Sequence, residues 1–198
     1  MNKLRIIGLA GTNGSGKDTI GQILADRHGY LFISVTELLR TEAARRKQAV
    51  TREVLRTISA EWRRELGLGV LVDKAVTEYE TATTTTTYSG VTIASLRNPG
   101  EADRIHEMGG TMIWIDADPR RRYERIQANI TLRGRVEEDD KTFDQFLEEE
   151  AAEMHTPSGG DAASLNSSGV KQRCDIFISN DGSDTIQLQA ELLRQLGL

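Results

Sequence analysis

The sequence has little cysteine and no pattern of metal-binding side chains. Its one cysteine, Cys174, excludes an internal disulfide, and no CxxC pair or close His/Cys spacing indicates a structural metal. The three histidines, at positions 28, 106 and 155, stand in unrelated contexts, so we assign them no role. This cysteine usage favours a reducing, cytoplasmic environment.

Long apolar runs and interdomain linkers are also absent from the sequence. No segment approaches the roughly 18 apolar residues of a membrane span, so we expect an unprocessed protein with no membrane partner. No stretch is rich enough in Pro, Gly or Ser to divide the 198 residues, and 1–198 should form one domain. The net charge of −5 argues against a general nucleic-acid surface and leaves small anionic ligands possible.

Strand-like and helix-like patterns alternate along the chain. Helical spacing over 51–67 places apolar side chains on one face, and a second helical segment, 17–29, ends at Gly29. Alternation of this kind predicts a layered α/β fold whose five parallel strands are flanked by helices. The apolar, β-branched runs that predict the strands are 4–10, 30–34, 91–95, 111–116 and 175–179. The apolar face of 51–67 is predicted to consist of Val54, Leu55, Ile58, Trp62 and Leu66.

Three other segments carry weaker patterns. The Thr-rich tract 81–90 is expected to extend the following strand or its approach. The Gly- and Ser-rich segment 155–172 is expected to be a mobile surface loop. Between them, the acidic run 137–154 has Phe143 and Phe146 at helical spacing, which predicts an acidic-faced helix packed on the core.

The stretch GTNGSGKDT, residues 11–19, lies between the first predicted strand and a predicted helix. Its glycines permit positive φ, so that successive N–H groups can point at phosphate oxygens, and the helix beginning near Lys17 adds its positive end. Lys17 supplies a point charge for the outer phosphates. The spacing GxxxxGK in this context predicts a phosphate-binding loop. Its predicted nucleotide-binding residues are Gly11, Asn13, Gly14, Ser15, Gly16, Lys17, Asp18 and Thr19.

The form GKDT resembles the loop of nucleoside monophosphate kinases such as adenylate kinase, and that of phage-type deoxynucleoside monophosphate kinases and dephospho-coenzyme A kinase-like proteins. The resemblance implies a three-layer P-loop kinase fold that uses ATP and Mg²⁺. Asp18 stands where a hydroxyl normally meets the metal. In the kinase family the metal is held largely through water, so the missing hydroxyl does not conflict with the resemblance.

Two further stretches carry the same resemblance. FISVTELLR, residues 32–40, is similar to a strand–helix segment of adenylate kinases, which implies that Thr36 and Arg40 bind the acceptor. Residues 35–80, including Arg63, are expected to form the acceptor site. IASLRNPGEADRI, residues 93–105, resembles the third strand of these kinases, which implies that Arg97 faces the reacting phosphates as a catalytic and substrate-binding residue.

The third strand also departs from the family pattern. Ala94 and Ser95 stand where relatives carry the Asp that organises Mg²⁺. This leaves Asp18, one residue past Lys17, as a candidate substitute carboxylate for the metal.

The remaining resemblances concern the lid and the nucleotide base. RGR, residues 133–135, lies where a lid, here 130–142, supplies arginines, which implies catalytic roles for Arg133 and Arg135. CDIFISNDGS is similar to the last strand and turn of dephospho-coenzyme A kinase-like enzymes, which places Asn180 and Gly182 beside the adenine. A plain turn explains Asn-Asp-Gly equally well.

Taken together, these motifs predict transfer of the ATP γ-phosphoryl to a (deoxy)nucleoside monophosphate or similar nucleotide. Dephospho-coenzyme A kinase is an open alternative. So is an ATP-binding regulator that lost catalysis along with the strand-three Asp. The acceptor, a preference for ATP or GTP, and the oligomeric state are left open.

Overall fold

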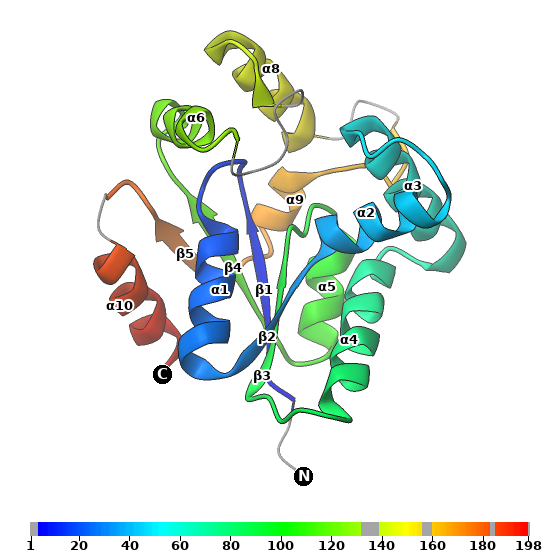
Figure 1. Ribbon diagram of the computed structural model, residues 1–198, viewed down its shortest axis with the longest axis vertical. Helices are drawn as coiled ribbons and strands as arrows, with labels where there is room; N and C mark the ends of the chain where they lie inside the picture. The colour runs from blue at the N-terminus through cyan, green and yellow to red at the C-terminus, as the bar shows by residue number, and fades with distance from the viewer. Residues whose placement is uncertain (1–3, 132–138, 156–159, 183–184, 198) are drawn as a thin grey trace.

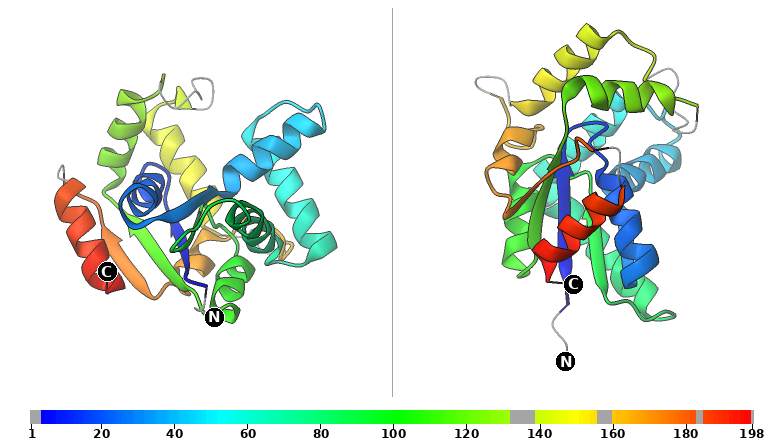
Figure 2. Two further views of the ribbon diagram at one scale, coloured as in Figure 1. Left: turned by 60° about the horizontal axis from the view of Figure 1, so that its bottom comes forward. Right: turned by 90° about the vertical axis from the view of Figure 1, so that its left-hand side faces the viewer.

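A computed structural model describes residues 4–131, 139–155, 160–182 and 185–197. Within them, a parallel sheet lies between two helical layers (Figures 1 and 2), which confirms the predicted fold class. The strands, in the order β2-β3-β1-β4-β5 across the sheet, are β1 (Ile6–Gly11), β2 (Tyr30–Ser34), β3 (Gly90–Ala94), β4 (Thr111–Asp116) and β5 (Ile176–Ser179). The helices are α1 (Lys17–His28), α2 (Val35–Arg45), α3 (Arg52–Leu66), α4 (Val70–Thr83), α5 (Pro99–Glu107), α6 (Pro119–Ala128), α8 (Phe143–Met154), α9 (Ser167–Lys171) and α10 (Thr185–Leu196).

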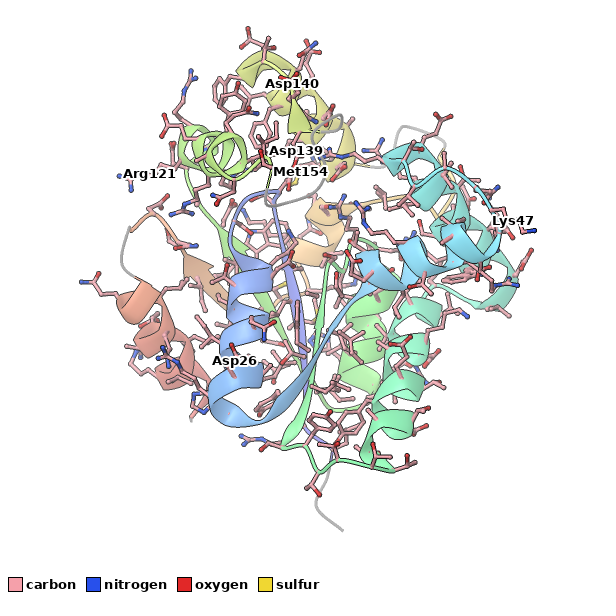
Figure 3. The ribbon with its side chains drawn as sticks, in the orientation of Figure 1. Asp26, Lys47, Arg121, Asp139, Asp140 and Met154 are labelled. Atoms are coloured by element: carbon pink, nitrogen blue, oxygen red, sulfur yellow. The ribbon has the colours of Figure 1, made fainter. Side chains whose placement is uncertain are left out.

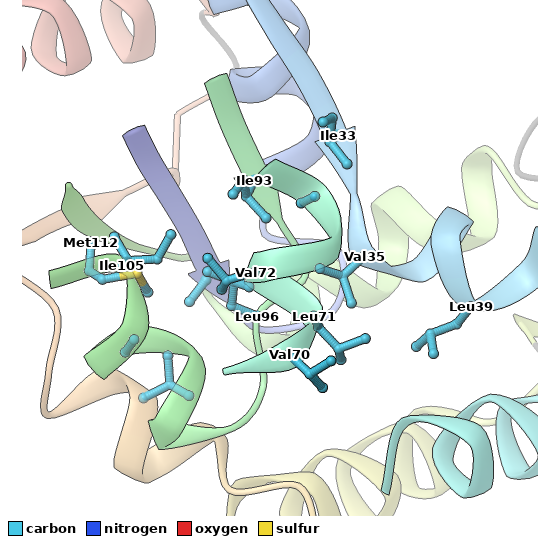
Figure 4. Packing of buried hydrophobic residues seen from close by; sticks show 14 of the residues in the cluster. Ile33, Val35, Leu39, Val70, Leu71, Val72, Ile93, Leu96, Ile105 and Met112 are labelled. Carbon is cyan, nitrogen blue, oxygen red and sulfur yellow. The ribbon is translucent and has the colours of Figure 1, made fainter. Parts of the chain in front are cut away.

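Both faces of the sheet are buried, because side chains alternate along each strand and helices cover each side. Ile7 and Leu9 of β1 belong to a core cluster that includes residues of α1 and α10. Ile6 of the same strand belongs to the opposite cluster, with residues of α4 and α5. Figure 4 shows part of this second cluster, in which Ile105 of α5 lies against Met112 of β4. The apolar runs of β3, β1 and β4 are therefore central strands, and those of β2 and β5 form the two edges of the sheet.

The parallel arrangement brings the carboxyl ends of all five strands to one edge of the sheet. Helices α2, α3, α6 and α8 lie beyond this edge, whereas both termini lie at the opposite end (Figure 1). Open parallel sheets bind ligands in the crevice at the carboxyl ends of their strands. We therefore expect the ligand site of this fold at that edge of the sheet.

Two expectations about local structure are wrong. Leu66 is 61% exposed, because α3 ends there and Gly67 turns the chain away with φ 100°. The Thr-rich tract does not begin a strand: α4 continues to Thr83, and β3 begins only at Gly90. The hydroxyl of Thr81 donates to the carbonyl of Thr77, so the threonines satisfy their side chains within the helix.

The described part of 155–172 is not the mobile loop that its composition suggests. Ala163 is buried, and α9 packs Val170 into the core. The side chain of Asn166 accepts the N–H of Gly169 and so caps α9. Tertiary packing therefore orders a segment whose residues individually favour turns.

Asn98 connects this segment to α5. Its side-chain oxygen accepts the N–H of Gly100 at 2.9 Å, and its amide nitrogen donates to the carbonyls of Ala162 and Ser164 at 2.8 Å. Asn98 is fully buried. One side chain thus caps a helix and anchors a crossing segment.

We expect Asn98→Ala to lower the free energy of unfolding by about 2–4 kcal/mol, since it removes a cap and leaves two carbonyls without a donor. Asn98→Asp should be no better, because a carboxylate would face those carbonyls. Urea unfolding measures both changes. Thr51→Ala, at the exposed cap of α3, is the control and should cost about 1 kcal/mol. Equal costs for Asn98→Ala and Thr51→Ala would contradict the anchoring role.

Candidate active site

The segment between β1 and α1 has a backbone shape that only glycine permits at several positions. Gly14 and Gly16 have φ of 78° and 95°. A Cβ on Gly11 would lie 2.0 Å from the carbonyl oxygen of Ile115, and one on Gly16 would lie 2.5 Å from the Nδ2 of Asn180. The glycines of the predicted loop are therefore required by its shape and by close neighbours.

Lys17 begins α1 and directs its side chain back over the loop. Its ammonium donates to the carbonyl of Thr12 at 3.3 Å, and the residue is largely buried. Asp18 and Thr19 follow in the first turn and are exposed. The positive end of the helix and the ammonium thus face the same space.

A cavity of about 430 Å³, here called the loop cavity, lies over this loop. Its size falls within the range of small-molecule sites. It brings together predicted residues from four parts of the chain. The lining residues are Asn13, Gly14, Gly16, Lys17, Asp18, Thr19, Thr36, Ser95, Arg97, Arg125, Ile126, Asn129, Asn180, Gly182 and Leu188.

The predicted base-binding turn forms one wall of the loop cavity. Asn180 donates from its Nδ2 to the carbonyl of Ser15 at 2.8 Å, which ties this turn to the phosphate loop. Arg125 of α6 donates to the carbonyls of Asn180 and Gly182 at 2.8 and 2.9 Å. Arg125 is a residue of the site that the sequence analysis did not select.

The described residues are compatible with a magnesium ion that the phosphates of a bound nucleotide hold, and not with one held by protein side chains alone. They contain no group of three or more His, Cys, Asp or Glu side chains arranged for a metal. Asp18 contributes one exposed carboxylate at the loop cavity. Mg²⁺ keeps several waters and takes few protein ligands, so a single carboxylate with phosphate oxygens is compatible with it.

Asp116, at the end of β4, is a second carboxylate near the loop that sequence reasoning did not select. It accepts from the Thr12 hydroxyl at 2.8 Å and from the N–H of Ala117 at 2.9 Å. The Arg122 guanidinium lies 3.7 Å from it. Asp116 does not line the loop cavity, so its contacts assign it to holding the loop in place.

A second cavity of about 70 Å³, here called the arginine cavity, adjoins the first. The two share Asn13, Thr36, Ser95 and Arg97. The arginine cavity is lined by Asn13, Val35, Thr36, Leu39, Arg40, Arg52, Leu55, Arg56, Ser59, Arg63, Ser95, Arg97, Glu153 and Leu165. An anion held among these arginines would lie beside the space over Lys17.

Arg52 and Arg56 of α3 were missed by sequence reasoning. With Ser59 and Arg63 they follow the spacing i, i+4, i+7 and i+11, which makes one stripe along a helix. This stripe runs beside the buried apolar face of α3, which contains Leu55. The repeat of arginines at helical spacing indicates this stripe in the sequence, but the sequence analysis considered only the apolar face of the helix.

The guanidinium of Arg63 lies deeper in the protein than a side chain that contacts a ligand usually does. It is almost fully buried and donates to the Glu101 carboxylate at 2.6 and 3.0 Å. Glu101 in turn accepts the backbone N–H groups of Arg97 at 2.7 Å and Asn98 at 3.1 Å. The ion pair therefore positions the chain at Arg97. A direct contact between Arg63 and an acceptor stays a prediction.

Helix α8 differs from the solvated acidic face that was expected. Phe146 does pack on the core, but Glu149, Glu150 and Glu153 turn toward arginines. Glu153 accepts from Arg56 at 2.6 Å and from Arg97 at 2.5 Å. The acidic side chains of α8 thus pair with arginines of α3, α6 and the β3–α5 connection.

The ionisation of Glu153 is set by these contacts. Burial alone would raise the pKa of its carboxyl, but the charges of Arg97 and Arg56 outweigh burial and hold that pKa at about 2. Glu150 makes a comparable bidentate pair with Arg122, at 2.5 and 2.8 Å. The Glu153 carboxyl is therefore ionised at neutral pH.

Ser95 has a strained backbone at the junction of the two cavities. Its φ is 70°, a left-handed value that non-glycine residues seldom adopt, and its N–H donates to the carbonyl of Leu9 at 3.1 Å. Such strain concentrates at functional sites. Ala94 is buried at the end of β3. Neither Ala94 nor Ser95 has a carboxylate to offer at this position.

The proposed lid arginines Arg133 and Arg135 lie outside the described residues. Thr36, Arg40 and Arg97 all line the arginine cavity. Lys17, Asn180 and Gly182 share the loop cavity with Thr36 and Arg97. The structure thus brings most of the predicted residues to one place. None of the described helices is both long and apolar enough to span a bilayer.

Comparison with known sequences gives the family of the chain. A family model described as an AAA domain (AAA_18) matches residues 7–153. The chain is 28% identical over 196 residues to a UPF0200 protein of Pyrobaculum aerophilum, covering 96% of this chain and 95% of that protein. It is 26% identical over 185 residues to a UPF0200 protein of Thermococcus kodakarensis, covering 90% and 89%.

Similar solved structures share the fold. A shikimate kinase from Bacteroides thetaiotaomicron is 18% identical, with a TM-score of 0.53 and coverage of 98% of this chain and 99% of that chain. A crystal structure of a Thermus thermophilus protein is 17% identical, with a TM-score of 0.56 and coverage of 98% and 97%. At these identities the likeness is one of fold, and that fold is the P-loop kinase fold.

We expect Ser95→Gly to be more stable than Ser95→Ala by about 1 kcal/mol, because glycine relieves the left-handed strain whereas alanine keeps it. Both variants lose the hydroxyl, so the difference isolates the backbone. Thermal and urea unfolding measure it. A Ser95→Gly variant that is less stable than Ser95→Ala would show that φ carries no strain here.

Proposed function

The chain belongs to the AAA-domain family whose model spans residues 7–153, and from this premise we propose that it transfers the γ-phosphoryl of ATP to a (deoxy)nucleoside monophosphate or similar nucleotide. The observation that carries the proposal is the junction of the two cavities. Ser95 and Arg97 line both, so a phosphate over Lys17 and an anion among the arginines would be neighbours. In-line phosphoryl transfer requires this arrangement.

The residues at the junction supply charge and position. Phosphoryl transfer spreads negative charge over the oxygens of the transferred group, and no covalent bond to the protein removes that charge. Fixed positive groups therefore provide most of the stabilisation of the transition state. Lys17 and the start of α1 face the phosphates of the donor nucleotide. Arg97 reaches both cavities and is proposed to stabilise the group in transit, with Arg133 and Arg135 as lid residues.

The nucleotide is proposed to lie along the loop cavity, with its phosphates on residues 11–19 and its base near Asn180 and Gly182. The support is the continuous lining of that cavity. Bound Mg²⁺ would neutralise charge between the outer phosphates. Asp18 is the residue of this chain proposed to orient the waters of that ion. We place the activity in the cytoplasm, on small molecules and not on nucleic acid.

The acceptor is proposed to bind between α2 and α3. Arg40, Arg52, Arg56 and Arg97 line the arginine cavity, and guanidinium groups match phosphate geometry well. Shikimate kinases share the fold, and a cavity lined so heavily with arginine favours an anionic acceptor over a neutral one. Dephospho-coenzyme A, which also bears phosphate, remains the enzymatic alternative.

A regulator that binds ATP without turnover is the second candidate. Ala94 and Ser95 favour it, because they bring no carboxylate to the end of β3. A coupled assay with ATP and Mg²⁺ against ribo- and deoxynucleoside monophosphates and dephospho-coenzyme A separates the candidates. Selective turnover supports a kinase and identifies its acceptor. Tight ATP binding with no turnover on any acceptor would support the regulator.

Lys17→Ala should weaken ATP binding and slow any transfer by about two orders of magnitude or more, because it removes the charge that faces the outer phosphates. Calorimetry measures the binding. Circular dichroism is the control for folding. Lys47→Ala is the control, since Lys47 is exposed just past the end of α2 and does not line the loop cavity (Figure 3). Unchanged ATP binding in Lys17→Ala would refute the assignment of residues 11–19.

Asp18→Asn should weaken ATP binding in the presence of Mg²⁺ and leave metal-free ATP binding nearly unchanged, because the carboxylate acts on the ion and not on the nucleotide. Titrations with and without Mg²⁺ measure this difference. Asp26→Asn, at the other end of α1, is the control (Figure 3). If Asp18→Asn has no effect that depends on Mg²⁺, Asp18 is an ordinary residue of the first helical turn.

A further inference from the structure

Glu153 brings a carboxylate into the wall of a cavity otherwise suited to anions. It reaches the cavity from α8 and accepts from Arg56 of α3 and from Arg97 at the β3–α5 connection. Its side chain is only 15% exposed. Two arginines from separate elements thus converge on a single, partly buried carboxylate.

Neighbouring arginines of the arginine cavity are neutralised in the same way. Arg63 pairs with Glu101, and Arg52 pairs with Glu149. The Glu101 pair lies deep and supports the backbone, whereas Glu153 lies at the cavity surface between groups proposed to hold the acceptor. A phosphate approaching Arg56 and Arg97 would therefore meet a carboxylate already in place.

We propose that Glu153 is a specificity-determining residue that occupies the position of the acceptor's anionic group at Arg56 and Arg97, and that the acceptor binds by displacing it. This inference rests on the proposed function for the location of the acceptor. Glu153 sets a threshold: an anion binds only if it satisfies the two arginines better than the internal carboxylate does.

The threshold favours phosphate esters over carboxylic acids. A carboxylate acceptor would replace Glu153 with an equivalent group of charge −1, so the exchange gains little. A phosphate monoester carries a charge of about −1.5 to −2 at pH 7 and offers three strong acceptor oxygens. Because arginine–phosphate contacts are charge-assisted and frequently bidentate, the exchange gains free energy. The geometry thus assigns the acceptor to the phosphate monoesters.

Calorimetric titration of the full-length protein with inorganic phosphate, and separately with acetate, tests the displacement without requiring turnover. In Glu153→Gln, phosphate should bind about tenfold tighter or more, because no internal charge competes for the arginines. Acetate should bind measurably only in the variant. Glu148→Gln is the matched control: it removes the same charge from an exposed position of α8 and should change neither titration.

The phosphate loop is itself an anion site, so the titrations are repeated in a Lys17→Ala background. The gain from Glu153→Gln should persist there and should disappear when Arg56→Ala is added. Phosphate binding that is unchanged or weaker in Glu153→Gln would overturn the proposal and leave Glu153 as a support for Arg97. Since these outcomes do not depend on ATP, they are separate from a failure of the kinase assay.

Glu153→Gln could also unfold the protein, because it leaves two arginines without their counter-ion. Glu153→Asp covers this case: it keeps the charge but is shorter by one methylene, so it should hold Arg56 and Arg97 less well. Phosphate should then bind Glu153→Asp tighter than the native protein and raise its melting temperature more. Equal phosphate-dependent shifts in the two proteins would refute displacement.

Discussion

The buried ion pair between Arg63 and Glu101 joins the parts of the candidate site. Arg63 comes from α3, and Glu101 lies in the first turn of α5, where it also accepts the backbone N–H of Arg97. Breaking one partner of such a pair leaves an uncompensated buried charge, so the pair is maintained as a unit. Helix α3 and the β3–α5 connection that bears Arg97 are therefore held in one geometry.

Around this fixed element the site contains alternating charges. Arginines from α2, α3 and the β3–α5 connection surround the arginine cavity, and carboxylates of α8 meet several of them. The loop cavity has a different character, since its anion-binding groups are the start of α1 and Lys17. An acceptor anion in the arginine cavity would thus meet guanidinium groups that already have carboxylate partners. Glu153 is the carboxylate that we propose competes with such an anion, because it accepts from both Arg56 and Arg97.

The elements of the fold were predictable because their signals are local. Buried parallel strands read as continuous apolar runs, and the β2 and β4 boundaries agree with the runs 30–34 and 111–116. Gly29 ends α1 in a left-handed conformation, as its position after the helical pattern suggested. The first residues of the Thr-rich tract, up to Thr83, are helical for a physical reason: hydroxyl-to-carbonyl bonds such as that from Thr81 to Thr77 satisfy threonine within α4.

The sequence by itself determined the phosphate loop, since glycine spacing, Lys17 and the flanking strand and helix lie within one short segment. Only the tertiary structure decided what surrounds it. Glu153 and Arg97 are separated by 56 positions, and Arg63 and Glu101 by 38, so no local pattern relates them. An acidic helix looks the same in sequence whether it faces water or arginines. Which partner it meets is decided by packing, because ion pairs form between side chains that the fold brings within reach.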